Sequence, residues 1–149
     1  MNLPGAQDRE KARWVVGRSL TLDILLRRNP HYENAARINV LSEKRHIRCY
    51  VSASAVTDIY YVAKKELKDN GIVLQLLKNL LKTTHIASVT ETGIHEALEL
   101  EWDDFEDSVQ YVAGQSISAE YIITRNPNDF SNSQIEVLSP EEFLNHITI

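Results

Sequence analysis

The sequence predicts an α/β domain of three layers, in which helices cover both faces of a central parallel sheet of about five strands. Short apolar, β-branched runs alternate with longer segments whose apolar residues recur at helical spacing. Strands separated by helices in this way are typical of a parallel sheet covered on both faces. A length of 149 residues, with 43% hydrophobic and 25% charged residues, suits one domain with a single core.

Five short runs of apolar or β-branched residues are expected to be strands. They cover residues 14–16, 47–51, 85–89, 121–124 and 135–138. The segments between and after them carry apolar residues on one side and are expected to be helices. These cover residues 20–26, 31–44, 52–67, 72–82, 90–100 and 105–115, with a last helix that begins at residue 139.

The limits of these helices are assigned from residues that favour helix termini. Side chains expected to accept hydrogen bonds from a first helical turn belong to Ser19, Ser52 or Ser54, Thr90, and Asp104 or Asp103. Pro30 prevents the first helix from continuing, and Asn70-Gly71 is expected to break the chain between two helices. Pro140 fits the first turn of the last helix, where its missing N–H is not needed.

Composition points to the cytoplasm and to one domain over residues 14–149, preceded by a loose N-terminal leader over residues 1–13. No apolar run approaches the roughly 20 residues that span a bilayer, so no membrane association is expected. The polar start of the chain lacks the apolar centre of a signal peptide. Cys49 is the only cysteine, and its place in an apolar strand predicts a buried, unreactive thiol.

Charge is distributed unevenly along the chain. Residues 1–75 carry 13 Lys and Arg against 8 Asp and Glu, a net charge of +5, whereas residues 76–149 carry 3 against 13, a net charge of −10. A phosphate-binding flank beside an acidic metal pocket would produce this pattern. Solvated faces and subunit contacts are the more ordinary explanation, so charge alone does not decide between them.

Four aspartates follow the expected strand ends, where sites form in parallel sheets. Asp58 lies one turn into a helix, Asp104 and Asp107 share one face of another helix, and Asp129 lies in a loop. Clustered carboxylates repel one another unless a divalent cation such as Mg²⁺ neutralises them, and such a cation can activate water against a phosphodiester. Helix capping by Asp104 and turn formation by Asp129 explain the same residues without a metal.

At these same positions the chain resembles the PIN-domain family, the fold of many bacterial toxin–antitoxin ribonucleases. Four blocks arrive in the family's order and extend the resemblance over almost all of residues 14–143. They are LDILLRRNPH at 22–31, VSASAVTDIY at 51–60, DFEDSVQY at 104–111 and IITRNPNDF at 122–130.

The resemblance implies a PIN-like fold with an acidic pocket that binds Mg²⁺ or Mn²⁺ and hydrolyses RNA. It assigns Asp58, Asp107 and Asp129 as metal ligands and catalytic groups, with Asp104 as a further catalytic carboxylate beside Asp107. Thr124 and Asn126 would line the pocket, and these two residues together with Arg18 would contact the substrate. RNA, an antitoxin protein and a second copy of the chain are the partners that it implies.

The first acidic motif departs from the family pattern. An Asp-Thr-Asn-like triplet is expected six residues ahead of the position of Asp23, and this chain has Gly17-Arg18-Ser19 there. Glycine supplies no ligand, and Arg18 adds positive charge where the metal would lie. Because the number of carboxylates sets the affinity for hard cations, metal binding should be weakened.

Two functional hypotheses follow. In the first, the chain is a metal-dependent endoribonuclease, such as a toxin component, with a compromised or rearranged pocket in which Asp23 or water replaces part of the missing ligand set. In the second, it is a non-catalytic module that binds RNA or a protein partner, and Arg18 acts as a counter-ion for Asp107 and Asp129. A receiver-type domain ranks low because its adjacent acidic pair and late lysine are missing.

Overall fold

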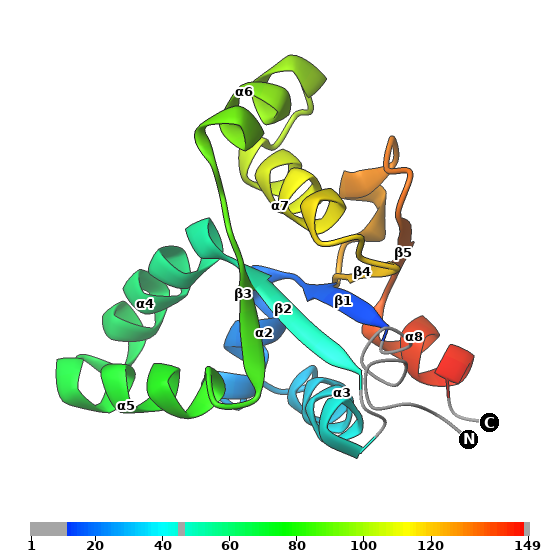
Figure 1. Ribbon diagram of the computed structural model, residues 1–149. Coiled ribbons are helices and arrows are strands. Elements are labelled where there is room, and N and C mark those ends of the chain that lie inside the picture. Colours follow the sequence, from blue (N-terminus) through cyan, green and yellow to red (C-terminus); the bar gives the residue numbers. More distant parts are fainter. Residues whose placement is uncertain (1–11, 45–46, 148–149) are drawn as a thin grey trace, which may run out of the picture.

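A computed structural model of the chain describes residues 12–44 and 47–147 and shows the expected α/β fold (Figure 1). Five strands form one parallel sheet in the order β3-β2-β1-β4-β5. Their bounds are β1 Arg13–Val16, β2 Arg48–Ser52, β3 Thr84–Ala87, β4 Tyr121–Ile123 and β5 Glu136–Leu138. The expected leader over residues 1–13 lies outside the described residues except for its last two, and Arg13 begins β1.

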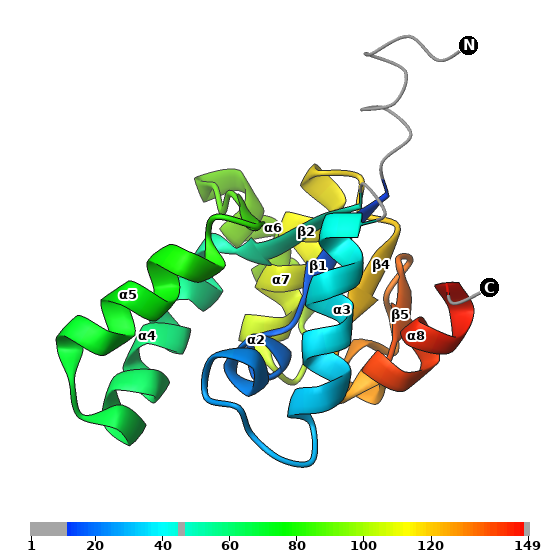
Figure 2. The same cartoon turned by 90° about the horizontal axis from the view of Figure 1, so that it is seen from below.

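Helices cover both faces of this sheet. Their bounds are α2 Arg18–Leu25, α3 Tyr32–Lys44, α4 Ala53–Leu67, α5 Asn70–Leu80, α6 Glu91–Leu100, α7 Phe105–Ser116 and α8 Pro140–Ile147. Helices α2, α3 and α8 lie on one face, as the view from below shows (Figure 2), and α6 and α7 lie on the other. Helices α4 and α5 form a hairpin that packs on α2. None of the helices in the described ranges is long and apolar enough to span a bilayer.

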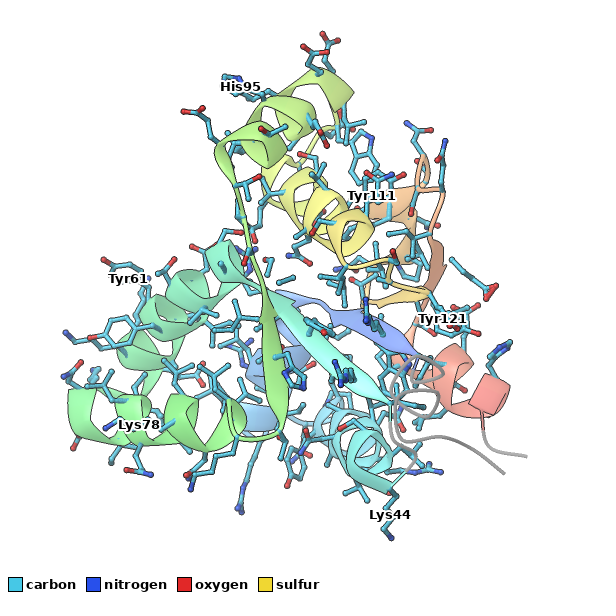
Figure 3. All side chains as sticks on the ribbon, viewed as in Figure 1. Lys44, Tyr61, Lys78, His95, Tyr111 and Tyr121 are labelled. Carbon is cyan, nitrogen blue, oxygen red and sulfur yellow. The ribbon has the colours of Figure 1, made fainter. Side chains whose placement is uncertain are left out.

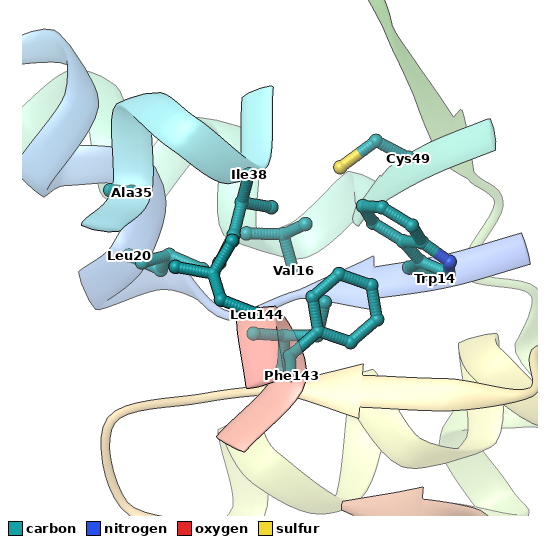
Figure 4. Packing of buried hydrophobic residues seen from close by; sticks show 9 residues of the cluster. Trp14, Val16, Leu20, Ala35, Ile38, Cys49, Phe143 and Leu144 are labelled. Atoms are coloured by element: carbon teal, nitrogen blue, oxygen red, sulfur yellow. The ribbon is translucent and has the colours of Figure 1, made fainter. Parts of the chain in front are cut away.

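The core is divided between the two faces because successive side chains of a strand point in opposite directions. In β1, Trp14 and Val16 face α2, α3 and α8, whereas Val15 faces α6 and α7. Figure 4 shows the first of these clusters, where the Trp14 ring meets the Phe143 ring edge to face at a centroid distance of 4.2 Å. Cys49 is buried beside them, and burial raises the pKa of its thiol to about 12, which confirms the expected core thiol.

The strand order reverses between β1 and β4, and this reversal marks the place in the sheet where a ligand crevice is expected. The chain moves from β1 outward through β2 to β3, then returns to place β4 on the other side of β1. In open parallel sheets the crevice for ligands lies at the carboxyl ends of the two strands that flank such a switch. Here those strands are β1 and β4.

The structure corrects three expectations about local elements. The residue that caps α2 is Gly17 rather than Ser19, and it makes no side-chain cap. The break between α4 and α5 is not at Asn70-Gly71, because these residues form the first turn of α5. Instead, Lys68 adopts the left-handed conformation that ends α4, and the side chain of Asp69 caps α5. A short 3-10 helix, η1 (Pro127–Phe130), occupies the loop after β4, because Phe130 is anchored in the core.

The other expected caps are present. Ser52 is the capping residue of α4, and Thr90 and Asp104 cap α6 and α7 through side-chain oxygens that accept backbone hydrogen bonds.

Candidate functional site

The carboxyl ends of β1 and β4 bring Gly17 and Thr124 side by side. The Gly17 amide donates to the carbonyl of Ile123 at 2.9 Å and so extends the strand pairing by one residue. Thr124 is buried, and its hydroxyl oxygen accepts the Asn126 amide at 3.2 Å. Thr124 therefore holds the start of the loop that carries Asn126 and Asp129, and the expected pocket-lining pair lies at the switch point.

Position 17 has room for a larger side chain. An added β-carbon would lie 3.4 Å from the Ile123 carbonyl oxygen and 3.6 Å from both the β-carbon and the hydroxyl oxygen of Thr124, which are ordinary contacts. The backbone of Gly17 is in the extended region that any residue adopts. Neither sterics nor backbone conformation requires glycine here, so its effect on the site is chemical: the position lacks an oxygen ligand.

Arg18 forms an ion pair with Asp58. Its Nη1 donates to Oδ2 of Asp58 at 3.1 Å, joining the first turn of α2 to the second turn of α4, and both side chains are about two-fifths exposed. We expected Arg18 to serve as counter-ion of Asp107 and Asp129 in a non-catalytic module, but its bonded partner is Asp58. Arg18 nevertheless lies close enough to Asp107 to lower the pKa of that carboxyl.

The start of α7 contributes a second group of carboxylates. Asp104 caps the helix by accepting the Asp107 amide at 3.2 Å, so the capping interpretation holds for this residue. Asp107 is half-buried, and burial together with the nearby charges of Asp104, Asp129 and Glu106 raises its pKa from 3.8 to about 6. These carboxylates therefore lie near one another, as the strand-end argument predicted.

Asp104 and Asp129 also line one small acidic crevice between the α6–α7 connection and η1. Its volume is about 190 Å³, and Asp103 and Asn128 lie on the same wall. Asp58 does not line this crevice. The four aspartates singled out in the sequence are thus divided: Asp58 pairs with Arg18, Asp104 and Asp129 share the crevice, and Asp107 lies within electrostatic reach of both groups.

Glu106 is a member of the site that sequence reasoning missed. Burial and the charge of Asp58 raise its pKa, although the amide of Gln110 donates to it at 3.3 Å. Gln110 is itself buried, and its side-chain oxygen accepts no hydrogen bond within the described chain. The sequence did offer one indication of this contact, because residues four apart on an expected helix, such as Glu106 and Gln110, lie on the same face.

Asp23 does not replace the missing ligand. Asp23 belongs to α2, and its side chain is fully buried, with its carboxylate 3.2 Å from Nε of Arg125. Burial raises the pKa of Asp23, and the positive charges of Arg125, His31 and Arg28 oppose that effect. The charges that shift the pKa of Asp23 do not include those of the candidate ligands Asp58, Asp107 and Asp129.

The donor set does not fit a divalent cation. Position 17 has no oxygen, Asp58 is engaged by an arginine, and Asp104 is engaged by the amide of Asp107. Within residues 12–44 and 47–147, no three His, Cys, Asp or Glu side chains converge in a way that could hold a metal ion. Mg²⁺ and Mn²⁺ require several oxygen ligands at once, which this arrangement does not supply.

The sequence matches the model of a family described as PIN domain over residues 13–128. None of the curated proteins compared with the chain matches it. Solved structures do, and several of them come from toxin–antitoxin systems.

Three of these structures illustrate the similarity of fold. One is the structure of VapBC2 from Rickettsia felis bound to a DNA fragment from the VapBC2 promoter. It aligns with a TM-score of 0.66 and 15% sequence identity, over 85% of this chain and 98% of that chain. VapC20 of Mycobacterium tuberculosis, a sarcin–ricin loop cleaving toxin, aligns with a TM-score of 0.60 and 12% identity over 73% of this chain and 86% of that chain. A toxin–antitoxin complex from Klebsiella pneumoniae aligns with a TM-score of 0.62 and 21% identity over 85% and 96%.

Proposed function

The chain belongs to the PIN-domain family, and from this premise we propose that it is a toxin–antitoxin-type PIN module that binds RNA and whose metal-dependent hydrolysis is weak or lost. The observation that carries the proposal is the Arg18–Asp58 ion pair beside Gly17. Nucleases of this family generally use divalent metals held by carboxylates. In this chain one of those positions has no side chain and the next carboxylate is neutralised by arginine.

The electrostatic consequence supports loss of metal affinity. Arg18 lies 3.1 Å from the Asp58 carboxylate, and it is close enough to lower the pKa of Asp107. A divalent cation bound among these carboxylates would have to displace or approach that positive charge, and like charges at such distances repel strongly in a partly buried site. Mg²⁺ and Mn²⁺ gain their affinity from the number of charged ligands, which is lower here.

The same arginine supports RNA binding. A guanidinium group provides paired donors that match phosphate oxygens, and the Arg18 side chain is about two-fifths exposed at the mouth of the switch point. Asn126 is exposed in the adjacent loop and adds an amide that can contact a base or a sugar hydroxyl. In this proposal Arg18 contacts RNA phosphate, and Thr124 holds the loop that presents Asn126.

The experiment pairs RNA binding with RNA cleavage. Binding of a fluorescent single-stranded RNA is followed by anisotropy, and cleavage is followed with Mn²⁺ present. Wild type should bind without detectable cleavage, and Arg18→Gln should bind more weakly with a shallower dependence on salt. Robust cleavage by wild type that disappears in Asp107→Asn and on metal removal would refute the proposal.

Restoring the missing acid tests the cause of the lost hydrolysis. Gly17→Asp combined with Arg18→Thr reproduces the first two residues of the family triplet, and a β-carbon added at position 17 makes only ordinary contacts. Cleavage should appear in this double variant and be absent from the matched Gly17→Asn, Arg18→Thr control, whose side chain has the same shape without the charge. If neither variant cleaves, the loss has a cause beyond these two positions.

Residual nuclease activity is the second candidate function, and the cluster around Asp107 favours it. Asp104, Asp129 and Glu106 raise the pKa of Asp107 by repulsion, a strain that a bound cation would relieve. Calorimetric titration with Mn²⁺ decides between the candidates. Binding by wild type that is lost in Asp107→Asn would support residual catalysis by these carboxylates.

Partners and location belong to the same proposal. The solved structures include toxin–antitoxin complexes, and we propose that an antitoxin-type protein and a second copy of this chain are partners here, in the cytoplasm. Light scattering on the purified chain tests the homodimer, and co-purification with the product of a neighbouring gene tests the antitoxin.

A further inference from the structure

One buried charge lies outside the acidic site and has no role in the proposal above. Asp23 has no exposed surface, and neither of its carboxylate oxygens accepts a hydrogen bond within the described residues. Its closest ionic partner is Nε of Arg125, at 3.2 Å, and that nitrogen is itself shielded from solvent. A buried carboxylate without a counter-charge is strongly unfavourable, so the position of Arg125 is fixed by Asp23.

The other cations near Asp23 do not replace Arg125. The charges of His31 and Arg28 also lower the pKa of the Asp23 carboxyl, each less than the charge of Arg125 does. The Arg28 backbone amide donates to the Asp23 backbone carbonyl at 3.1 Å and makes no hydrogen bond with the carboxylate. Arg28 also donates to Glu66 on α4 at 3.4 Å, in an exposed ion pair. The Asp23–Arg125 ion pair joins α2 to the loop that follows β4.

This loop carries the exposed groups of the candidate site. Its start is held by the Thr124 amide, which donates to Leu138 at 3.0 Å. Its end is held by Phe130, which is buried with its ring 5.8 Å from that of Trp102. Between these two anchors, the Arg125 side chain places its Nε, which is shielded from solvent, beside the buried Asp23 carboxylate.

We propose that Asp23 is a positioning residue whose buried carboxylate holds Arg125 and thereby fixes segment 124–130, with Asn126 and Asp129, at the mouth of the acidic site. The inference rests on the proposed function in one respect, namely that this segment contacts RNA. Its separate claim is that the Asp23 carboxylate pairs with Arg125 of the loop and is not available as a metal ligand.

Amide hydrogen exchange measures the order of the segment directly. The Asn126 amide donates to the Thr124 hydroxyl oxygen and the Asp129 amide donates to the Asn126 carbonyl at 3.0 Å, so their protection depends on the loop conformation. In Asp23→Asn, exchange of segment 124–130 should rise by about tenfold, the factor expected when one charge-assisted contact is lost. Exchange of α5, which is distant from the loop, should not change.

Two further variants separate positioning from general destabilisation. Arg125→Lys keeps the charge but loses the planar guanidinium, so exchange of the segment should be intermediate between wild type and Asp23→Asn. Glu66→Gln breaks the exposed Arg28–Glu66 pair and should leave the segment unchanged. Because Asp23 has no exposed surface, weaker RNA binding by a stably folded Asp23→Asn would have to arise through the loop.

The inference is overturned if segment 124–130 exchanges at the wild-type rate in Asp23→Asn, or if α5 accelerates by the same factor. Should Asp23→Asn fail to fold, Arg125→Lys decides, and wild-type exchange in that variant overturns the inference. Exchange is measured without RNA. Failure of wild type to bind RNA would therefore reject the proposed function, while the exchange result would still decide the role of Asp23.

Discussion

Replacing Asp107 with asparagine should make the protein more stable at neutral pH and change its response to acid. Burial and the charges of Asp104, Asp129 and Glu106 raise the pKa of Asp107 from 3.8 to about 6 in the folded state. Between these two values the native state binds more protons than the unfolded state, so the free energy of unfolding falls as pH rises through this range. Above pH 6 the full penalty of the ionised carboxylate is present.

The size of the effect follows from the same two values. The rise in the pKa of Asp107 from 3.8 to about 6 corresponds to a loss of at most about 3 kcal/mol in the free energy of unfolding at neutral pH. Solvent screens part of this because Asp107 is only half-buried, so we expect asparagine to raise the free energy of unfolding by about 1–2 kcal/mol at pH 7.5. Near pH 4, where the native carboxyl is already protonated, the gain should be close to zero.

Urea unfolding monitored by tryptophan fluorescence measures this difference, since Trp14 and Trp102 report on the two faces of the sheet. Wild type and Asp107→Asn are compared at pH 4, 5.5 and 7.5, with Glu99→Gln on α6 as an exposed control whose difference from wild type should stay constant. A stability difference between Asp107→Asn and wild type that does not change with pH would refute the electrostatic explanation.

Three other outcomes follow from individual contacts. Arg18→Gln should cost less than about 1 kcal/mol in urea unfolding, because its pair with Asp58 is partly exposed, and a larger loss would mean that the pair has a structural role. The Cys49 thiol, with its pKa raised to about 12, should react with Ellman's reagent only after unfolding, and rapid reaction of the native protein would contradict its burial. Phe143→Ala should lower the free energy of unfolding by about 3–5 kcal/mol, since the ring is fully buried against Trp14; calorimetry that shows an unchanged melting temperature would contradict this packing.

Much of the surface behaves as ordinary solvated structure and sets no constraint on function. Tyr61 and Lys78, on the outer sides of α4 and α5, point away from the sheet (Figure 3), and Tyr61 is 69% exposed. Packing of Tyr61 is limited to a contact with the neighbouring Tyr60 ring at 5.5 Å. The candidate site lies instead near the carboxyl ends of β1 and β4.

The fold could be read from the sequence because its signals are local. The apolar run in β1, the helical spacing in α4 to α7 and the caps at Ser52, Thr90 and Asp104 each involve residues that are neighbours along the chain. Where a local signal was misread, tertiary packing had decided the outcome. Gly17 begins α2 because its amide completes the pairing with β4, which no nearby residue indicates.

The sequence by itself determined the family, the lack of a side-chain oxygen at position 17 and the set of aspartates available to the candidate site. Only the tertiary structure decided which charges meet. Arg18 pairs with Asp58, 40 residues away, and Asp23 pairs with Arg125, 102 residues away along the numbering. Ion pairs of this kind depend on how helices and loops pack at one edge of the sheet, and their strength depends on burial, which residue order alone does not specify.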